Sequence, residues 1–158
     1  MSGFFKRIGG WIAAVVTTVI FGIFLQTQNV LARLEGIGAD IGLAERLSMS
    51  FYDLRYLGSL YIIFVGLALA IAFLVGGLVF RFAKFGRRFA KFGRPLIYTV
   101  AGAIALLTML FGMKQVFFDI HMIAGARDGL GISLQMLAGG IGGFVFAKLS
   151  RPKLQSDQ

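Results

Sequence analysis

The chain has 158 residues and a formal net charge of +9, and 58% of its residues are hydrophobic. Its mean hydropathy of +0.83 is far above that of soluble globular domains, so lipid is the expected solvent for most of the chain. This length leaves room for a single domain, residues 1–158, and the lack of cysteine excludes disulfides, thiolate nucleophiles and thiolate metal sites.

Four apolar stretches with charges only at their borders follow one another along the chain. A hydrocarbon core of about 30 Å takes about 20 helical residues to cross. We predict membrane-spanning helices over residues 8–30, 57–80, 95–114 and 129–147. Lys6 and Arg7 precede the first stretch as they would in a cleavable signal peptide, but the stretch is longer than such a segment and no small-x-small cleavage site follows it. The predicted fold is therefore an all-α integral membrane protein with four transmembrane helices.

Positive charges are concentrated before the first span, between the second and third, and after the fourth. Eleven of the 16 lysines and arginines lie there, whereas six of the seven acidic residues lie in the opposite segments, which include an outer loop at 31–56. Lys and Arg accumulate on the cytoplasmic side of short loops. We therefore expect both termini and the basic loop 81–94 in the cytoplasm (N-in/C-in), in a multi-pass protein of the bacterial inner membrane. Since the net charge then reflects orientation, nucleic acid is not an expected partner.

The basic loop contains a seven-residue unit, Arg-Phe-Ala-Lys-Phe-Gly-Arg, written twice. Its phenylalanines can enter the headgroup boundary while its cations meet anionic lipid, each contributing up to about 1 kcal/mol near the surface. The simpler interpretation is a stop-transfer signal that only pins the hairpin, and two glycines favour a kinked interfacial segment over a rigid helix. The residues predicted to contact anionic lipid are Arg81, Lys84, Arg87, Arg88, Lys91 and Arg94.

A fainter repeat relates the two halves of the chain. Residues 38–49 match residues 125–136 at six of twelve positions, and the spans before these segments share a Phe-Gly pair, at residues 21–22 and 111–112. We interpret this match as a duplication in which two parallel-repeated helical hairpins are related by an axis along the membrane normal. Sequences rich in glycine and alanine also match by chance, and the first outer loop is longer than the second.

Small residues recur at four-residue spacing on three of the predicted spans. Lipid gives helices no hydrophobic reason to associate, so close packing of small residues has to provide it. We expect these ridges to form contacts inside one bundle, with an interface in a homo-oligomer or a larger membrane complex as the alternative. The ridges are Ala14, Thr18 and Gly22; Ala68, Ala72 and Gly76; and Gly139 and Gly143.

Polar residues are few in the cores of the spans, and none of them is charged. A proton-coupled exchanger ordinarily needs an ionisable group inside the bilayer, so that activity is not expected. Asp119 lies near the only histidine, His121, and such a pair can titrate near neutral pH. Anchoring of helix ends is the alternative. The candidate polar or pH-sensing site comprises Gln26, Gln28, Lys114, Gln115, Asp119, His121 and Gln135.

No catalytic, metal or cofactor site is predicted, because the common nucleophile, zinc and phosphate-loop motifs are absent and one histidine without cysteine leaves few nucleophile and base pairs. Two functions remain. The first is a small non-catalytic membrane protein, a scaffold or accessory subunit that packs against membrane lipids or a larger complex. The second is a channel-like protein for passive permeation of small solutes, formed by the bundle or its oligomer, with a path between Gln26, Gln28, Gln115 and Gln135. A continuous polar path would favour permeation, and a dry, glycine-packed interior would argue against it.

Overall fold

The computed structural model describes residues 2–82, 90–116 and 128–150. Within these ranges it has no strand and five α-helices: α1 (Ser2–Gly36), α2 (Leu43–Tyr56), α3 (Gly58–Phe82), α5 (Ala90–Val116) and α6 (Gly129–Leu149). Among the described residues, four stretches are long and apolar enough to cross a membrane: Phe4–Gly36, Gly58–Val79, Gly93–Gln115 and Gly129–Leu149. The structure therefore confirms the predicted all-helical class and the presence of four candidate membrane spans.

Helix α1 continues beyond residue 30, where the predicted span ends. Its last turn is closed by the N–H groups of Gly38 and Ala39, which donate to the carbonyl oxygens of Glu35 and Leu34 at 2.9 and 3.1 Å. Gly38 has a φ of 98°, which a residue with a side chain rarely adopts. The helix therefore ends where a glycine allows the chain to turn, and not where its apolar stretch ends.

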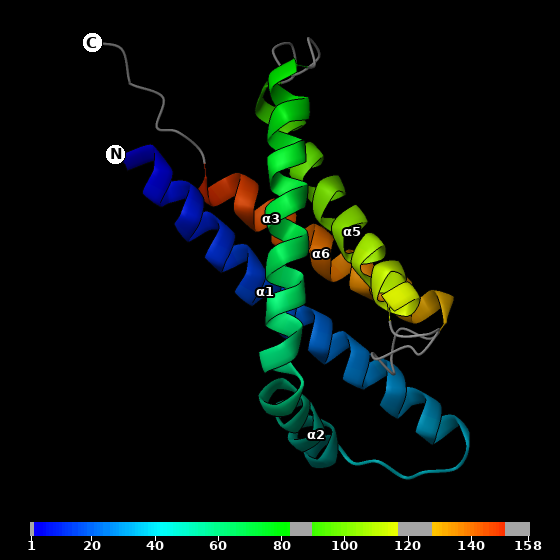
Figure 1. Cartoon of the computed structure of the whole chain (residues 1–158). Helices are drawn as coiled ribbons and strands as arrows, with labels where there is room; N and C mark the ends of the chain where they lie inside the picture. Colours follow the sequence, from blue (N-terminus) through cyan, green and yellow to red (C-terminus); the bar gives the residue numbers. More distant parts are fainter. Residues whose placement is uncertain (1, 83–89, 117–127, 151–158) are drawn as a thin grey trace.

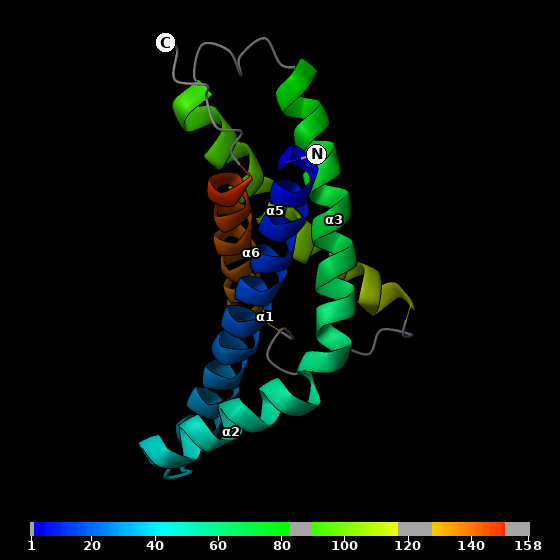
Figure 2. The same cartoon turned by 90° about the vertical axis from the view of Figure 1, so that its left-hand side faces the viewer.

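The predicted outer loop 31–56 is largely helical. Apolar residues Leu43, Leu47, Phe51 and Leu54 recur at helical spacing in α2, and the Glu45 carboxylate accepts a hydrogen bond of 3.2 Å from the N–H of Gly42 at the start of the helix. Helix α2 lies across one end of the molecule at a large angle to α3 (Figure 2).

The basic segment 81–94 is also partly helical. Helix α3 continues to Phe82 and α5 begins at Ala90, so that Pro95 lies inside α5 and not at its first position. Pro95 is the sixth residue of α5, so the helix lacks the hydrogen bond that an N–H at this position would donate to the carbonyl oxygen of Lys91. Residues 83–89 lie outside the described residues.

The four long helices form one bundle in which α6 packs most extensively against α5 and α1. Helices α1 and α6 run antiparallel and side by side, whereas α3 crosses α1 and α5 at an angle (Figures 1 and 2). The start of α1, the end of α6, and the ends of α3 and α5 that flank residues 83–89 lie together at one end. This end carries Lys6, Arg7, Arg94 and Lys148 and is called the basic end below; α2 and the start of α6 lie at the opposite end.

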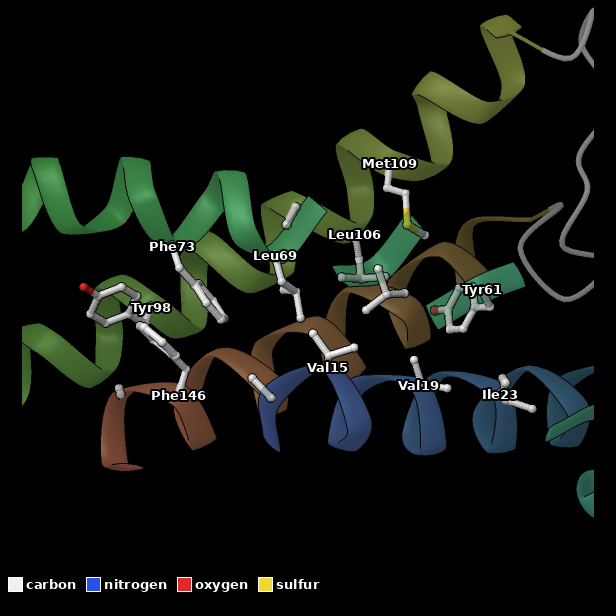
Figure 3. Close-up of a cluster of buried hydrophobic side chains, with 14 of the residues drawn as sticks. Val15, Val19, Ile23, Tyr61, Leu69, Phe73, Tyr98, Leu106, Met109 and Phe146 are labelled. Carbon is white, nitrogen blue, oxygen red and sulfur yellow. The ribbon is translucent and has the colours of Figure 1, made fainter. Parts of the chain in front are cut away.

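The core of the bundle contains side chains from all four long helices (Figure 3). Near the basic end, the ring of Phe73 stacks on that of Phe146 with centroids 4.2 Å apart, and Tyr98 meets both rings edge-on. Leu69 and Leu106 fill the middle and are fully buried. The spans therefore share a single packed interior.

Glycines bring the backbones of α5 and α6 into direct contact. A methyl group at Gly102 would overlap the carbonyl oxygen of Gly139, and one at Gly143 would overlap the carbonyl oxygen of Tyr98. The predicted ridge of Gly139 and Gly143 is thus a helix contact inside the bundle. We call this contact of Gly102, Gly139 and Gly143 the glycine seam.

The opposite side of α6 packs on the predicted ridge of α1. A methyl group at Gly142 would lie 2.9 Å from the carbonyl oxygen of Ala14 and would overlap the hydroxyl oxygen of Thr18. That hydroxyl is fully buried and has no hydrogen-bond partner among the described residues. Helix α6 is therefore held closely on two sides.

Residues that correspond in the predicted duplication have different surroundings. Gly22 packs against Tyr61 and Gln135, whereas a methyl group at its counterpart Gly112 would meet no atom within 4 Å. The matched segment 125–136 begins outside the described residues. The duplication stays a prediction.

Candidate functional site

A small polar cluster joins three helices in the interior. Gln135 of α6 is 1% exposed, and its carboxamide oxygen accepts a hydrogen bond of 2.5 Å from the hydroxyl of Tyr61 in α3. Its amide nitrogen donates to the carbonyl oxygen of Gly22 in α1 at 3.0 Å. Glycine is needed at position 22, because a methyl group there would lie 2.7 Å from the Tyr61 hydroxyl. Both ends of the carboxamide are therefore engaged by the protein itself.

A second polar cluster holds α2 against α1. The carboxamide of Gln28 accepts from the Arg46 guanidinium at 3.0 Å and donates to the hydroxyl of Ser50 at 3.3 Å. Arg46 also forms an ion pair with Glu35, and the Ser50 hydroxyl donates to the carbonyl oxygen of Arg46 at 2.8 Å. These bonds occupy both polar atoms of Gln28, so its side chain positions α2.

The Thr27 hydroxyl reinforces this attachment. It lies 2.8 Å from a carboxylate oxygen of Asp53 in α2 and 2.9 Å from the carbonyl oxygen of Ile23, one turn earlier in α1. The Thr27 hydroxyl has one proton and donates it to one of these two acceptors at a time. Either hydrogen bond gives this buried hydroxyl a partner.

Asp128 fixes the start of α6 to the end of α1. Its carboxylate accepts from the N–H of Gly131 at 3.1 Å and from the amide of Asn29 at 3.5 Å, and it forms an ion pair with Arg33. Desolvation opposes ionisation of this carboxyl, but the Gly131 hydrogen bond, the Arg33 charge and the bonds from Asn29 and Arg33 outweigh it. Together they hold the pKa of Asp128 below its ordinary value.

Arg94 closes the other end of α6. Its guanidinium donates to the carbonyl oxygen and the hydroxyl of Ser150 at 2.8 and 3.0 Å, and it lies 5.6 Å from the ring centroid of Tyr98. A cation at the carboxyl end of a helix is favoured by the helix dipole. The described partners of Arg94 thus belong to the protein, and its contact with lipid stays a prediction.

The structure describes five of the seven residues of the predicted polar site, and these five have different surroundings. Gln135 and Gln28 belong to the two clusters described above, and Gln26 is buried one turn after Gly22 on α1. Lys114 is half-buried and Gln115 exposed near the end of α5, while Asp119 and His121 lie outside the described residues. Among the predicted lipid contacts, Lys84, Arg87 and Arg88 also lie outside them, and the side chains of Arg81 and Lys91 are not described.

Sequence reasoning missed Asp128, Asn29 and Arg33. An aspartate directly before an apolar helical stretch is a signal for a helix start, and Asp128 carries it. Its partners lie about 100 residues earlier in the chain, and no local pattern indicates them. Within the described ranges, no three His, Asp or Glu side chains come close enough together to hold a metal ion.

An apolar groove of about 940 Å³ lies between α3 and α5. Its lining includes Ala68, Ala72 and Gly76, the predicted small-residue ridge of the second span, and from α5 it includes Ala101 and Ala105. Bulky aliphatic residues lie beside them, among them Leu67 and Ile104, which are 61% and 53% exposed. Thr108 is the only polar side chain among the described residues of the lining. Here small residues leave a hollow that no described helix fills.

No protein-family model matches the chain, and neither a curated protein nor a solved structure matches it.

Proposed function

We propose that the chain is a multi-pass protein of a bacterial inner membrane and acts there as a non-catalytic scaffold or accessory subunit. The observation that carries this proposal is the closed interior of the bundle. Its buried amide at Gln135 is engaged by Tyr61 and Gly22, and glycines bring α5 and α6 into backbone contact. Such an interior holds helices together, because its polar groups are engaged by the protein itself.

The proposed orientation, with four crossings and both termini in the cytoplasm, is supported by the distribution of charge between the two ends. The basic end gathers Lys6, Arg7, Arg94 and Lys148, whereas the described acidic side chains all lie toward the end that carries α2. The acidic residues are Glu35, Asp40, Glu45, Asp53 and Asp128. Cytoplasmic enrichment of Lys and Arg assigns the basic end to the cytoplasm.

Permeation is the rival function, and the packing argues against it. Of the four glutamines on the expected path, Gln28 and Gln135 are hydrogen-bonded within the protein, and Gln115 is exposed near the end of α5. A conducting path needs polar groups that remain available to a solute along its length.

The orientation is tested by site-specific labelling, for which the cysteine-free chain is suited. We expect Ser48→Cys, at an exposed position of α2, to react with a membrane-impermeant maleimide in intact cells. Gly86→Cys in the basic segment should react only after the membrane is opened. Labelling of Gly86→Cys in intact cells would reject the proposed orientation.

The choice between the two functions is tested in liposomes and by native purification. We expect liposomes with the purified protein to release small solutes no faster than empty liposomes, and we expect a stoichiometric protein partner after extraction in mild detergent. A flux that Gln28→Leu or Gln115→Leu abolishes would reject the scaffold role in favour of permeation. Native mass spectrometry that finds the chain without any protein partner would reject the accessory role.

A further inference from the structure

We propose that the groove between α3 and α5 binds the acyl chains of an anionic phospholipid from the cytoplasmic leaflet, with the headgroup at the basic end of the molecule. This inference rests on the membrane orientation proposed above. It is independent of which protein partner the chain has.

The groove has the length and the lining of an acyl-chain site. Its lining residues run from Phe64 to Val79 on α3 and from Leu96 to Met113 on α5. At 1.5 Å per helical residue these stretches are about 22 and 26 Å long, which is most of a hydrocarbon core of about 30 Å. A long apolar trough of this kind matches extended hydrocarbon chains.

The crossing of α3 over α5 explains why the trough exists. The two helices approach at Gly76, where a methyl group would lie 3.5 Å from Ala101 and Tyr98. They cross at an angle and do not run side by side (Figures 1 and 2). Small residues such as Ala68, Ala72 and Ala105 cannot fill the space that the crossing leaves.

Cations are more numerous at one end of the groove than at the other, where Lys114 follows the last lining residue. The lining ends at Val79 and Leu96, and the segment between these residues contains six cations and no acid. Arg81 lies two residues after Val79 in α3, and Lys91 lies in the first turn of α5. Cations near a membrane surface attract anionic lipid. The groove therefore fits an occupant with two apolar chains and one negatively charged end.

A membrane helix from a second copy fits less well. Both a helix face and acyl chains are apolar, so the charge at the ends of the groove decides between them. A spanning helix has no reason to prefer a groove that is more cationic at one end. We therefore assign the groove to lipid and make a second copy an outcome of the test.

The test is native mass spectrometry of the full chain with added phosphatidylglycerol or phosphatidylcholine of identical acyl chains. We expect one phosphatidylglycerol molecule to be retained at least about fivefold more than phosphatidylcholine. Ala72→Phe should abolish this retention by filling the groove. Val16→Phe is the matched control, because Val16 is 44% exposed on α1 and outside the groove.

The headgroup end is tested without altering the groove. Combined Arg81→Gln and Lys91→Gln should remove the preference for phosphatidylglycerol, whereas combined Lys6→Gln and Arg7→Gln, which remove two charges from α1 at the same end, should keep it. This pair of variants keeps the proposal falsifiable even if Ala72→Phe fails to fold.

Three results would overturn the proposal: equal retention of the two lipids, retention that survives Ala72→Phe in a folded protein, or a dimer that Ala72→Phe dissociates. The last result would assign the groove to a second copy. Lipid retention is measured on the purified protein. Orientation is measured by labelling in cells, and the protein partner is identified by native purification. Failure of this inference is therefore distinguishable from failure of the proposed function.

Discussion

Helices α6 and α3 both carry small residues at four-residue spacing, yet the structure uses them in opposite ways. On α6, Gly139 and Gly143 meet Gly102 and the backbone of α5 directly. On α3, Ala68 and Ala72 line an open groove. The difference teaches that spacing alone does not predict close packing. Backbones touch where glycines of two helices face each other, whereas alanine methyl groups across a crossing keep the helices apart.

The largest expected effect comes from breaking the tightly packed side. Gly143→Ala should destabilise the protein by about 3 kcal/mol or more, because the added methyl group meets the backbone carbonyl of Tyr98, which cannot move aside as a side chain can. Thermal unfolding in detergent measures the effect.

The matched control for this substitution is Gly112→Ala on α5, where a methyl group meets no atom within 4 Å. We expect it to be neutral or to stabilise by up to about 1 kcal/mol, since alanine favours helix. Equal melting temperatures for the two variants would show that the glycine seam is packed no more tightly than the surroundings of Gly112.

A smaller loss is expected from the interior polar cluster. Gln135→Leu removes the hydrogen bonds to Gly22 and Tyr61 and leaves the tyrosine hydroxyl unpaired, at a cost of about 2 kcal/mol. Tyr61→Phe alone should cost about 1 kcal/mol. The double variant should cost less than the two single variants together, because both remove one shared bond. Strict additivity would show that the two residues do not interact.

The end of α6 provides a pH-dependent comparison. Asp128 has a pKa below its ordinary value of 3.8, so its charge stabilises the folded protein at neutral pH. This contribution is lost as the pH falls below about 5 and through the lowered pKa of the folded state. Asp128→Asn keeps a helix-capping side chain but loses the ion pair with Arg33.

We therefore expect Asp128→Asn to lower the melting temperature at pH 7 and to change it less at pH 3. The exposed Asp40, which lies between α1 and α2, gives the control Asp40→Asn, for which we expect little change at either pH. A melting-temperature difference for Asp128→Asn that does not shrink on acidification would show that the charge of Asp128 is not what stabilises this end.

The smallest effect is expected at Thr18. Its buried hydroxyl has no hydrogen-bond partner among the described residues, so Thr18→Ala should change the free energy of unfolding by less than about 1 kcal/mol. Thr27→Ala removes the same atoms but also a hydrogen bond to Ile23 or Asp53, and it should cost more. The reverse order in thermal unfolding would mean that Thr18 has a polar role.

Much of the helical framework can be predicted from the sequence, because apolar length and charged borders are properties of each stretch by itself. The exact helix ends depend on more. Helix α1 continues past residue 30, where Arg33 pairs with Asp128 and Glu35 pairs with Arg46, and it stops before Gly38. Helix α2 has apolar residues at helical spacing, but it also carries charged residues. A prediction from hydropathy alone therefore places this segment in an outer loop and does not recognise the helix.

Hydropathy and charge along the chain are enough to predict that four helices can span a membrane and that positive charge gathers at one end of them. Three features follow only from the packed fold: Gln135 bonds to Gly22 and Tyr61, Arg94 holds the end of α6, and α3 leaves a groove on α5. Hydropathy is summed along one segment. Contacts between segments depend on how each helix is rotated and where it crosses its neighbours, and those angles are set by all the packed side chains together.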